Sequence, residues 1–540
     1  MSRSQALPRR RRHRTAALVT GLISSVAMVV VAPPIGAVGY GSQSPHLALA
    51  RTVDGWLRGN SAHGVDSFLG VPYAAPPVGD LRWRPPQPLI PWNGLRRATT
   101  YGNRCPQLES TNGPGSDTED CLYLNVQRPR GAFRSRLPVY VFFHGGGNEN
   151  GSGDQHDGSK FVREGRIIVV TVNYRLGVFG ALAHPALSAE GGGDSGNYSF
   201  LDQQASLRWV QSHIADFGGD PARVTIGGES SGAFMVCSHL SAPGSQGLFA
   251  AAVIESGSGC WFGQPLADAE RAGTTIADAV GCPNDEHVLG CLRGLPPEAL
   301  VDKTDGLSYV VTGTPTVPTD PRANLFSGAF AHVPVLIGGN LDEARTFLAD
   351  PPISTEADYR SSLQNSWGDS ADTVFDHYPW SPQPGDNGYT GNYLLSATFT
   401  DAFFACATRE VVVQLAARTP TFVYEFSHRE GPGLGDKYPG YVWGAGHAAE
   451  LPYMWPSFDN GLPIASEFDS AEKRLAGVMV AYWSSFVVKG QPAVHGLPRW
   501  PSFNHGSSLM SLDVGRDLGL INDASFTANH QCAFWAGLLQ

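Results

Sequence analysis

The sequence lacks the residue spacings that metal sites usually need. It contains no Cys-x-x-Cys pair and no close cluster of histidines and cysteines. Zinc sites, structural or catalytic, normally show such spacing, so we expect no metal ion. The eight cysteines are an even number, which favours disulfide bonds if the chain is exported.

Basic residues are scarce. Lysine and arginine number 38 against 49 aspartates and glutamates, which gives a formal net charge of −11. Six of the arginines lie in the first 37 residues, so removal of that segment would bring the charge to −17. An acidic chain is a poor partner for nucleic acid or for an anionic membrane, and we expect neither.

Long apolar runs are absent except at the N-terminus. Residues 16–32 are largely apolar, follow the arginines at 9–12 and 14, and lead to small residues at 35–37. This pattern predicts a secretory signal peptide, residues 1–37, and therefore a secreted protein with no stable membrane insertion after cleavage. The alternative is a membrane anchor, because 17 residues approach the length of a short spanning helix. The export route stays open.

The remaining residues, 38–540, predict a single α/β domain. Short runs rich in β-branched or aromatic residues, typical of buried parallel strands, occur at 138–143, 167–174, 224–226, 251–255, 333–337 and 422–426. Helical patterns occur between and after them, at 202–214, 232–240 and 470–488. This alternation predicts a doubly wound, mostly parallel sheet. Residues 350–400 lack strand signals and predict an irregular helical excursion over the sheet.

The most informative motif is Gly-x-Ser-x-Gly at residues 228–232, between a predicted strand and a predicted helix. A sharp strand-to-helix turn strains the serine backbone, requires small neighbours, and leaves the hydroxyl exposed beside a helix N-terminus. Ser230 is therefore the candidate nucleophile. The motif alone is weak evidence in a chain with 64 glycines, so the assignment of Ser230 as nucleophile depends on the sequence around it.

Those surroundings supply the other parts of a serine hydrolase. The sequence His-Gly-Gly-Gly at 144–147 ends a predicted strand, where its backbone could approach a substrate carbonyl; the alternative is a plain glycine turn. Glu343 follows another predicted strand, and His447 lies in a loop of small residues. The order Ser230, Glu343, His447 is the nucleophile, acid and base order of α/β-hydrolases.

Further motifs extend the pattern over nearly the whole chain, at residues 68–77, 119–125, 173–177 and 217–221. With these motifs the chain resembles the type-B carboxylesterase/lipase family, which includes cholinesterases and fungal lipases. The resemblance implies an α/β-hydrolase fold, no cofactor, and hydrolysis of a small-molecule or lipid ester through an acyl-enzyme. It implies Ser230 as nucleophile, His447 as general base and then acid, and Glu343 as the partner that orients His447.

The resemblance also implies roles for residues around the triad. The oxyanion donors would be the backbone N–H groups of Gly146, Gly147 and Ser231, and Ser256 would place a hydroxyl near the acid. The implied ion pairs are Arg82–Glu119 and Arg175–Asp202, and the implied disulfides are Cys105–Cys121, Cys282–Cys291 and Cys406–Cys532. Cys237 and Cys260 remain, either as a fourth bridge, which we favour, or as two free thiols. Position 231 departs from the family, which usually has alanine there.

The substrate is less well specified. In the family's cholinesterases the loop between the first two bridged cysteines carries a tryptophan that binds ammonium, and in its lipases this loop is a longer lid. Residues 106–120 here contain no aromatic residue, which argues against cholinesterase activity. The loop is also short, which argues against a large lid and favours small to medium acyl esters. By position, Trp261 and Phe347 are candidates for the acyl pocket or are ordinary core aromatics.

Three other functions stay open. A lipase or sterol esterase would differ in acyl-chain preference, and an amidase or carbamate hydrolase would use the same triad. A non-catalytic adhesion module is a further alternative, because some family members are cell-surface binders. Those usually lack a triad residue, whereas all three are present here. The sequence does not specify the oligomeric state.

Overall fold

The computed structural model describes residues 47–261, 263–307, 309–435, 438–459, 463–515 and 518–539. The signal peptide predicted at 1–37, and the anchor that is its alternative, lie outside these residues. The largest sheet of the described part has eleven strands in the order β16-β15-β14-β13-β10-β9-β7-β8-β6-β4-β3. Their bounds, in chain order, are β3 (Asn60–Ala62), β4 (Val65–Pro72), β6 (Tyr123–Pro129), β7 (Leu137–Phe143), β8 (Ile168–Val172), β9 (Gly219–Glu229), β10 (Ala251–Glu255), β13 (Val335–Asn340), β14 (Thr421–Phe426), β15 (Ser508–Leu512) and β16 (Gly519–Asn522).

The centre of this sheet is parallel and its edges are antiparallel. Strands β8, β7, β9, β10, β13, β14 and β15 pair in parallel, whereas β3, β4, β6 and β16 join through antiparallel pairs. Two small sheets stand apart, one of β1 (Leu49–Thr52), β2 (Gly55–Arg58) and β5 (Leu95–Arg97), the other of β11 (Gly263–Pro265) and β12 (Val310–Thr312). The predicted mostly parallel sheet is confirmed.

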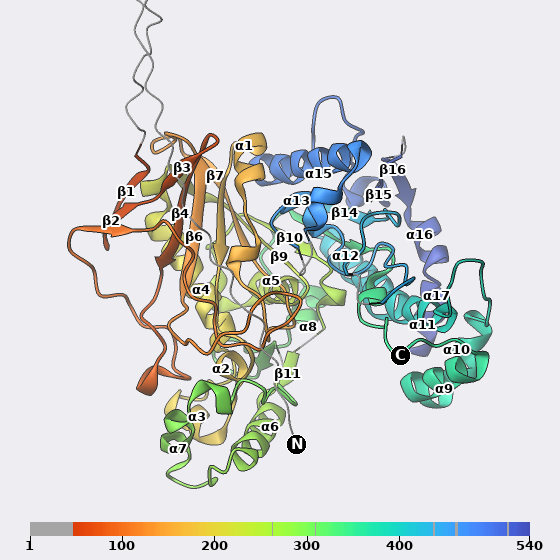
Figure 1. Cartoon of the computed structure of the whole chain (residues 1–540), viewed down its shortest axis with the longest axis horizontal. Helices are drawn as coiled ribbons and strands as arrows, with labels where there is room; N and C mark the ends of the chain where they lie inside the picture. The colour runs from red at the N-terminus through yellow and green to blue at the C-terminus, as the bar shows by residue number, and fades with distance from the viewer. Residues whose placement is uncertain are drawn as a thin grey trace, which may run out of the picture. The chain divides into compact units, whose positions relative to one another are not determined.

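Helices cover both faces of the sheet (Figure 1). In chain order they are α1 (Ser159–Gly165), α2 (Gly177–Ala181), α3 (Pro185–Glu190), α4 (Tyr198–His213), α5 (Ser231–Ser241), α6 (Leu266–Ala279), α7 (Val288–Gly294), α8 (Pro321–Ser327), α9 (Glu356–Trp367), α10 (Ala371–His377), α11 (Thr390–Phe399), α12 (Cys406–Ala416), α13 (Leu451–Met454), α14 (Ile464–Glu467), α15 (Ser470–Lys489), α16 (Asp523–Asn529) and α17 (Cys532–Leu538). The segment 350–400, predicted as a helical excursion, contains α9, α10 and α11, and the sheet resumes at β14.

The alternation of side chains along a strand explains why both faces are apolar. In β7, Val139, Val141 and Phe143 belong to the core cluster that contains residues of α4, α5 and α12. Tyr140 and Phe142 belong to the opposite cluster, which contains residues of α1, α13 and α15. Successive residues of a strand point to opposite faces, so a strand covered on both sides is apolar throughout. This is why the parallel strands were recognisable as short unbroken apolar runs.

The longest helix shows how local sequence sets its ends. Helix α15 begins after Asp469, whose side chain accepts from the N–H of Glu472, while the Glu472 carboxylate accepts from the N–H of Asp469. This capping box satisfies N–H groups that a helix start leaves free. The helix ends at Gly490, which adopts a left-handed backbone with φ 68°. No helix of the described residues is both long enough and apolar enough to cross a membrane.

The described residues contain four disulfide bonds, between cysteines 9 to 126 positions apart in the sequence. They include the three implied pairs, Cys105–Cys121, Cys282–Cys291 and Cys406–Cys532, and the pair left open by the sequence, Cys237–Cys260. The described cysteines thus leave no free thiol. The fourth pair connects α5 to the turn after β10, two elements that the parallel pairing of β9 with β10 places side by side.

Candidate active site

Ser230 lies at a strained turn between a central strand and a helix. Strand β9 ends at Glu229 and α5 begins at Ser231, and Ser230 between them has φ 54° and ψ −125°. Such a backbone is costly for a residue with a side chain and is held here by the surrounding structure. A Cβ at Gly232 would overlap the carbonyl oxygen of Phe143. Glycine is therefore required at this position of the motif for helix and sheet to approach so closely.

His447 and Glu343 are joined by a short hydrogen bond. His447 Nδ1 donates to Glu343 Oε2 at 2.6 Å, and the backbone N–H of His447 donates to the Glu343 carbonyl at 3.1 Å. The other carboxylate oxygen of Glu343 accepts the N–H of Asn340, the last residue of β13, at 2.8 Å. Both side chains are buried. The end of β13 thus fixes the acid, and the acid fixes the orientation of the imidazole.

The loop after β7 exposes backbone N–H groups beside Ser230. Gly146 and Gly147 have φ values of 103° and 68°, which side chains rarely adopt. A Cβ at Gly146 would overlap the carbonyl oxygen of Asn150. Among the described residues, no acceptor is found for the N–H groups of Gly146, Gly147 or Ser231. These three groups are therefore available to an oxygen atom bound next to Ser230.

Ser230, His447 and the glycine loop surround one cavity of about 360 Å³. Phe347 also lines it, and its ring centre lies 4.9 Å from that of His447. Trp261, the other candidate for the acyl pocket, is not among the residues that line this cavity; its ring lies under the guanidinium of Arg322, 3.9 Å from the ring centre. The structure therefore brings Phe347, and not Trp261, to the site.

Two buried carboxylates near His447 were not singled out by the sequence. Glu229 Oε1 lies 3.1 Å from His447 Nε2, so this ring nitrogen faces Glu229 in the structure. Glu450 accepts a 2.5 Å hydrogen bond from the side chain of Asn340. Burial raises the pKa of Glu229 to about 7 and that of Glu450 to about 8. Glu229 stands within the motif that identified Ser230, but only the fold reveals its burial beside His447.

The carboxylates around the His447 ring determine its protonation state. Burial by itself lowers the pKa of His447, but the negative charges of Glu229 and Glu343 outweigh it and raise this pKa to about 9. Pairing with two carboxylates thus favours the protonated ring. A histidine in this environment is well suited to hold a proton between two steps of a reaction.

The two serines named beside the triad are both buried. The backbone N–H of Ser256 donates to Gly338, and Ser256 and Glu343 line a common small cavity, but the Ser256 hydroxyl has no hydrogen-bond partner among the described residues. The structure thus brings Ser256 near the acid without a bond to it. The Ser231 hydroxyl lies beside that of Tyr174.

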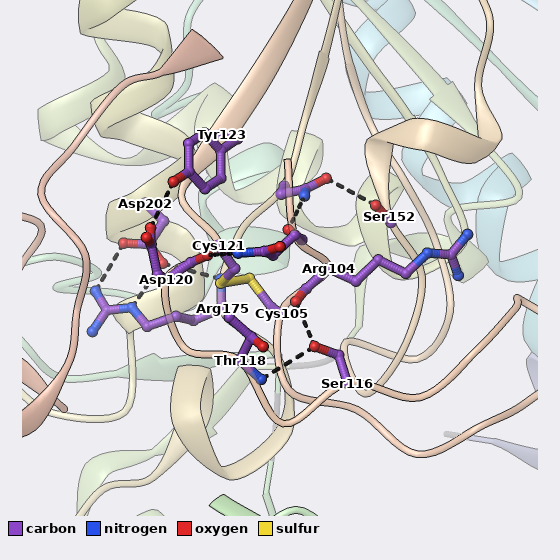
Figure 2. The surroundings of a disulfide bond; sticks show 12 residues. Arg104, Cys105, Ser116, Thr118, Asp120, Cys121, Tyr123, Ser152, Arg175 and Asp202 are labelled. Atoms are coloured by element: carbon purple, nitrogen blue, oxygen red, sulfur yellow. Dashed lines mark hydrogen bonds and ion pairs between the residues drawn. A yellow bond between two sulfur atoms is a disulfide. The ribbon is translucent and has the colours of Figure 1, made fainter. Parts of the chain in front are cut away.

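The loop closed by Cys105–Cys121 is held against its surroundings by polar contacts. Figure 2 shows Arg104, Ser116 and Thr118 around this disulfide: the Ser116 hydroxyl donates to the Arg104 carbonyl at 2.8 Å and accepts from the Thr118 N–H at 3.2 Å.

The two implied ion pairs, Arg82–Glu119 and Arg175–Asp202, are both present and buried, which confirms them. No group of His, Cys, Asp or Glu in the described part of the chain is arranged to hold a metal ion.

A largely parallel sheet with a strained serine turn after a central strand defines an α/β-hydrolase. Residues 45–535 match the model of the carboxylesterase family, and the chain belongs to this family. It is 35% identical over 489 residues to the fumonisin B1 esterase of Sphingopyxis macrogoltabida, covering 84% of this chain and 85% of that one. It is 32% identical over 548 residues to the cocaine esterase of Homo sapiens, covering 95% of both chains.

Solved structures agree with this assignment. A PNB esterase and a thermophilic PNB esterase superpose with TM-scores of 0.74 and 0.75, each at 29% identity and over 90% of this chain and 99% of the other. The protein is a carboxylic-ester hydrolase, which confirms the predicted fold and the predicted class of enzyme.

Proposed function

We propose that the protein hydrolyses esters through Ser230, His447 and Glu343. Ser230 Oγ attacks the ester carbonyl carbon while His447 Nε2 takes its proton; the C–O bond to the alcohol then breaks, and the alcohol leaves with that proton. Water attacks the acyl-enzyme in the same way and releases the acid. The observation that carries the proposal is the strained Ser230 turn in one cavity with a histidine that Glu343 orients at 2.6 Å.

The oxyanion of each tetrahedral intermediate would accept from the backbone N–H groups of Gly146, Gly147 and Ser231. This assignment is supported by the absence of competing acceptors for these groups among the described residues. One such donor contributes on the order of 10²–10³ in rate. Because the donors belong to the backbone, a side-chain substitution does not remove them.

We further propose that the substrates are small to medium acyl esters and that the protein is secreted. The disulfide loop has no aromatic residue that would serve as an ammonium site. Two relatives, a cocaine esterase and a fumonisin B1 esterase, are named for esters that are not triglycerides. Secretion is supported by four disulfide bonds. N-terminal sequencing of protein from the culture medium tests it, with cleavage after Ala37 as the expected result.

Acyl-chain length separates this proposal from lipase or sterol-esterase activity. For p-nitrophenyl esters from acetyl to palmitoyl, we expect kcat/KM to be highest at acetyl to hexanoyl and to fall steeply beyond. If kcat/KM were instead highest for the palmitoyl ester, the protein would be a lipase. A wild-type protein that hydrolyses none of the series but binds cell surfaces would support the adhesion alternative, and turnover of matched p-nitroanilides at similar rates would support an amidase.

The Glu229 carboxylate offers a pH test of His447 as the base. A base must be neutral to accept the proton of Ser230, and the charge of Glu229 favours the protonated ring at His447. In Glu229→Gln this charge is lost, so the pKa of His447 falls and its neutral form appears at lower pH. The acidic limb of the kcat/KM–pH profile should therefore move down by about one to two pH units. Glu149→Gln, which removes an exposed carboxylate at the same cavity, is the matched control. If the acidic limb of the profile does not move in Glu229→Gln, the assignment of His447 as the base is contradicted.

A further inference from the structure

Glu343 and His447 lie on two segments that are bonded to each other at several points. We call residues 340–346 the acid turn and residues 444–447 the base loop. Besides the hydrogen bonds between Glu343 and His447 themselves, the Thr346 hydroxyl donates to the His447 carbonyl at 3.1 Å. The position of the imidazole therefore depends on how these two segments are held together.

Asp342 bonds the acid turn to the base loop through both its backbone and its side chain. The Asp342 N–H donates to the Ala445 carbonyl at 2.9 Å, and Asp342 Oδ2 accepts the Ala445 N–H at 3.1 Å. A Cβ at Gly444 would lie 2.6 Å from Asp342 Oδ2, so the loop needs glycine there to come this close. The Asp342 side chain is only 7% exposed. Its carboxylate therefore sets the spacing of the two segments.

Arg429 holds the same carboxylate. It follows β14 in the chain, and its guanidinium donates to both oxygens of Asp342, from Nε to Oδ2 at 2.7 Å and from Nη2 to Oδ1 at 2.8 Å. Two parallel bonds of this kind fix the plane of a carboxylate as well as its position. Arg345 lies farther away, with Nη2 at 3.4 Å from Oδ1. One oxygen of Asp342 thus accepts from both Arg429 and the base loop.

The pair of Asp342 and Arg429 lies away from the substrate. Neither residue lines the cavity beside Ser230. Both line a second cavity, of about 420 Å³, together with residues such as Thr400. The Arg429 side chain is 53% exposed, so small ions in solution can reach the place of its guanidinium. The pair is thus placed to act on catalysis through the position of His447, and not by contact with an ester.

We propose that Asp342 and Arg429 are positioning residues: the carboxylate, oriented by the guanidinium, holds the base loop and thereby the imidazole of His447. The proposal rests on the hydrolytic function proposed above and adds to it two residues that do not touch the reacting atoms. Proton transfer requires the imidazole within hydrogen-bond reach of Ser230, and a displacement of about 1 Å can lower a rate by about 10². Loss of either residue should therefore lower kcat and leave KM nearly unchanged.

Arg429→Ala tests the proposal in a form that can be reversed. The variant should fold, because Arg345 still lies beside the Asp342 charge. For p-nitrophenyl butyrate we expect kcat to fall by about 10- to 100-fold, with KM within about threefold of the wild type. Guanidinium chloride at about 50 mM, far below the molar concentrations that unfold proteins, should then raise kcat by about fivefold or more. Sodium chloride at the same concentration should not.

Two further variants separate positioning from general stability. Asp342→Asn keeps the shape of the side chain but loses its charge and one acceptor, and it should lower kcat by a similar factor without a response to guanidinium. Arg409→Ala is the control: Arg409 also makes two hydrogen bonds to an aspartate, Asp523, at 2.8 and 2.7 Å, but this pair joins α12 to α16. Its kcat should stay within about threefold of the wild type, with no response to guanidinium.

Three results would overturn the proposal. The first is a folded Arg429→Ala, as judged by thermal unfolding, that retains the wild-type kcat. The second is a loss of kcat that guanidinium does not reverse, because the guanidinium group is the part of Arg429 that the proposal uses. The third is an equal loss in Arg409→Ala. If the wild type hydrolyses no ester, or if hydrolysis persists in Ser230→Ala, the proposed function fails instead.

Discussion

Ser230→Ala is expected to lower kcat for ester hydrolysis by a factor on the order of 10⁶, equivalent to about 8 kcal/mol of transition-state stabilisation. The substitution removes the atom that forms the acyl-enzyme, and His447 then has no proton to take from the nucleophile. Binding and the oxyanion donors remain, so a residual rate of about 10³–10⁴ above that in water is expected. The measurement is kcat for p-nitrophenyl butyrate, with thermal unfolding as a check that the variant is folded.

Ser231→Ala is the matched control, because it deletes a hydroxyl one residue away. The backbone N–H of residue 231 is unchanged, and the start of α5 accommodates alanine without strain. We expect kcat to stay within about tenfold of the wild type, since no step of the mechanism uses this hydroxyl. Equal losses in both variants would mean that the turn, and not the Ser230 hydroxyl, is what activity requires.

Arg175→Met is expected to destabilise the fold by about 3–5 kcal/mol. The Arg175 guanidinium makes two hydrogen bonds of 2.8 Å to Asp202, and both side chains are almost fully buried, at 3% and 0% exposure. Without the arginine side chain, the buried Asp202 carboxylate keeps only one of its hydrogen bonds to residue 175, from the backbone N–H at 3.1 Å. The midpoint of thermal unfolding should fall by roughly 3–5 °C, because the unfolding entropy of so long a chain is large.

Two further variants isolate burial as the cause. Arg136 also pairs with an aspartate, Asp220, at 3.3 Å, but its side chain is 76% exposed, so Arg136→Met should cost less than about 1 kcal/mol. In Arg175→Met/Asp202→Leu no charge is left unpaired, and most of the lost stability should return. If Arg175→Met lowers the stability as little as Arg136→Met does, the buried ion pair does not stabilise the fold.

Much of the site was predictable because its signals are local. The turn at Ser230 requires glycine at the position where a Cβ would overlap the neighbouring strand of the sheet. The loop at 144–147 requires glycine for its positive φ values. Glu343 and His447 were placed by their positions after a strand and within a small-residue loop. The parallel strands were predictable for a similar reason, because strands buried on both faces are apolar without interruption.

The remainder depends on residues that are far apart in the sequence. Glu229 and Glu450 have raised pKa values because the fold buries them against partners more than 100 residues away, which no short sequence pattern records. Trp261 and Phe347 were equal candidates for the pocket until the structure placed an arginine over the first and His447 beside the second. The short strands β3, β15 and β16, at or next to the edges of the sheet, were also missed, because three to five residues carry too little periodicity.

The most direct test of the account is to locate the covalent intermediate. Diethyl p-nitrophenyl phosphate transfers its diethylphosphoryl group to an activated serine and gives a stable adduct that peptide mass spectrometry can place. We expect one diethylphosphoryl group per chain, on Ser230, with loss of esterase activity in proportion to the modified fraction. Complete inactivation with Ser230 unmodified, or an adduct on a different residue, would contradict the central claim that Ser230 is the nucleophile.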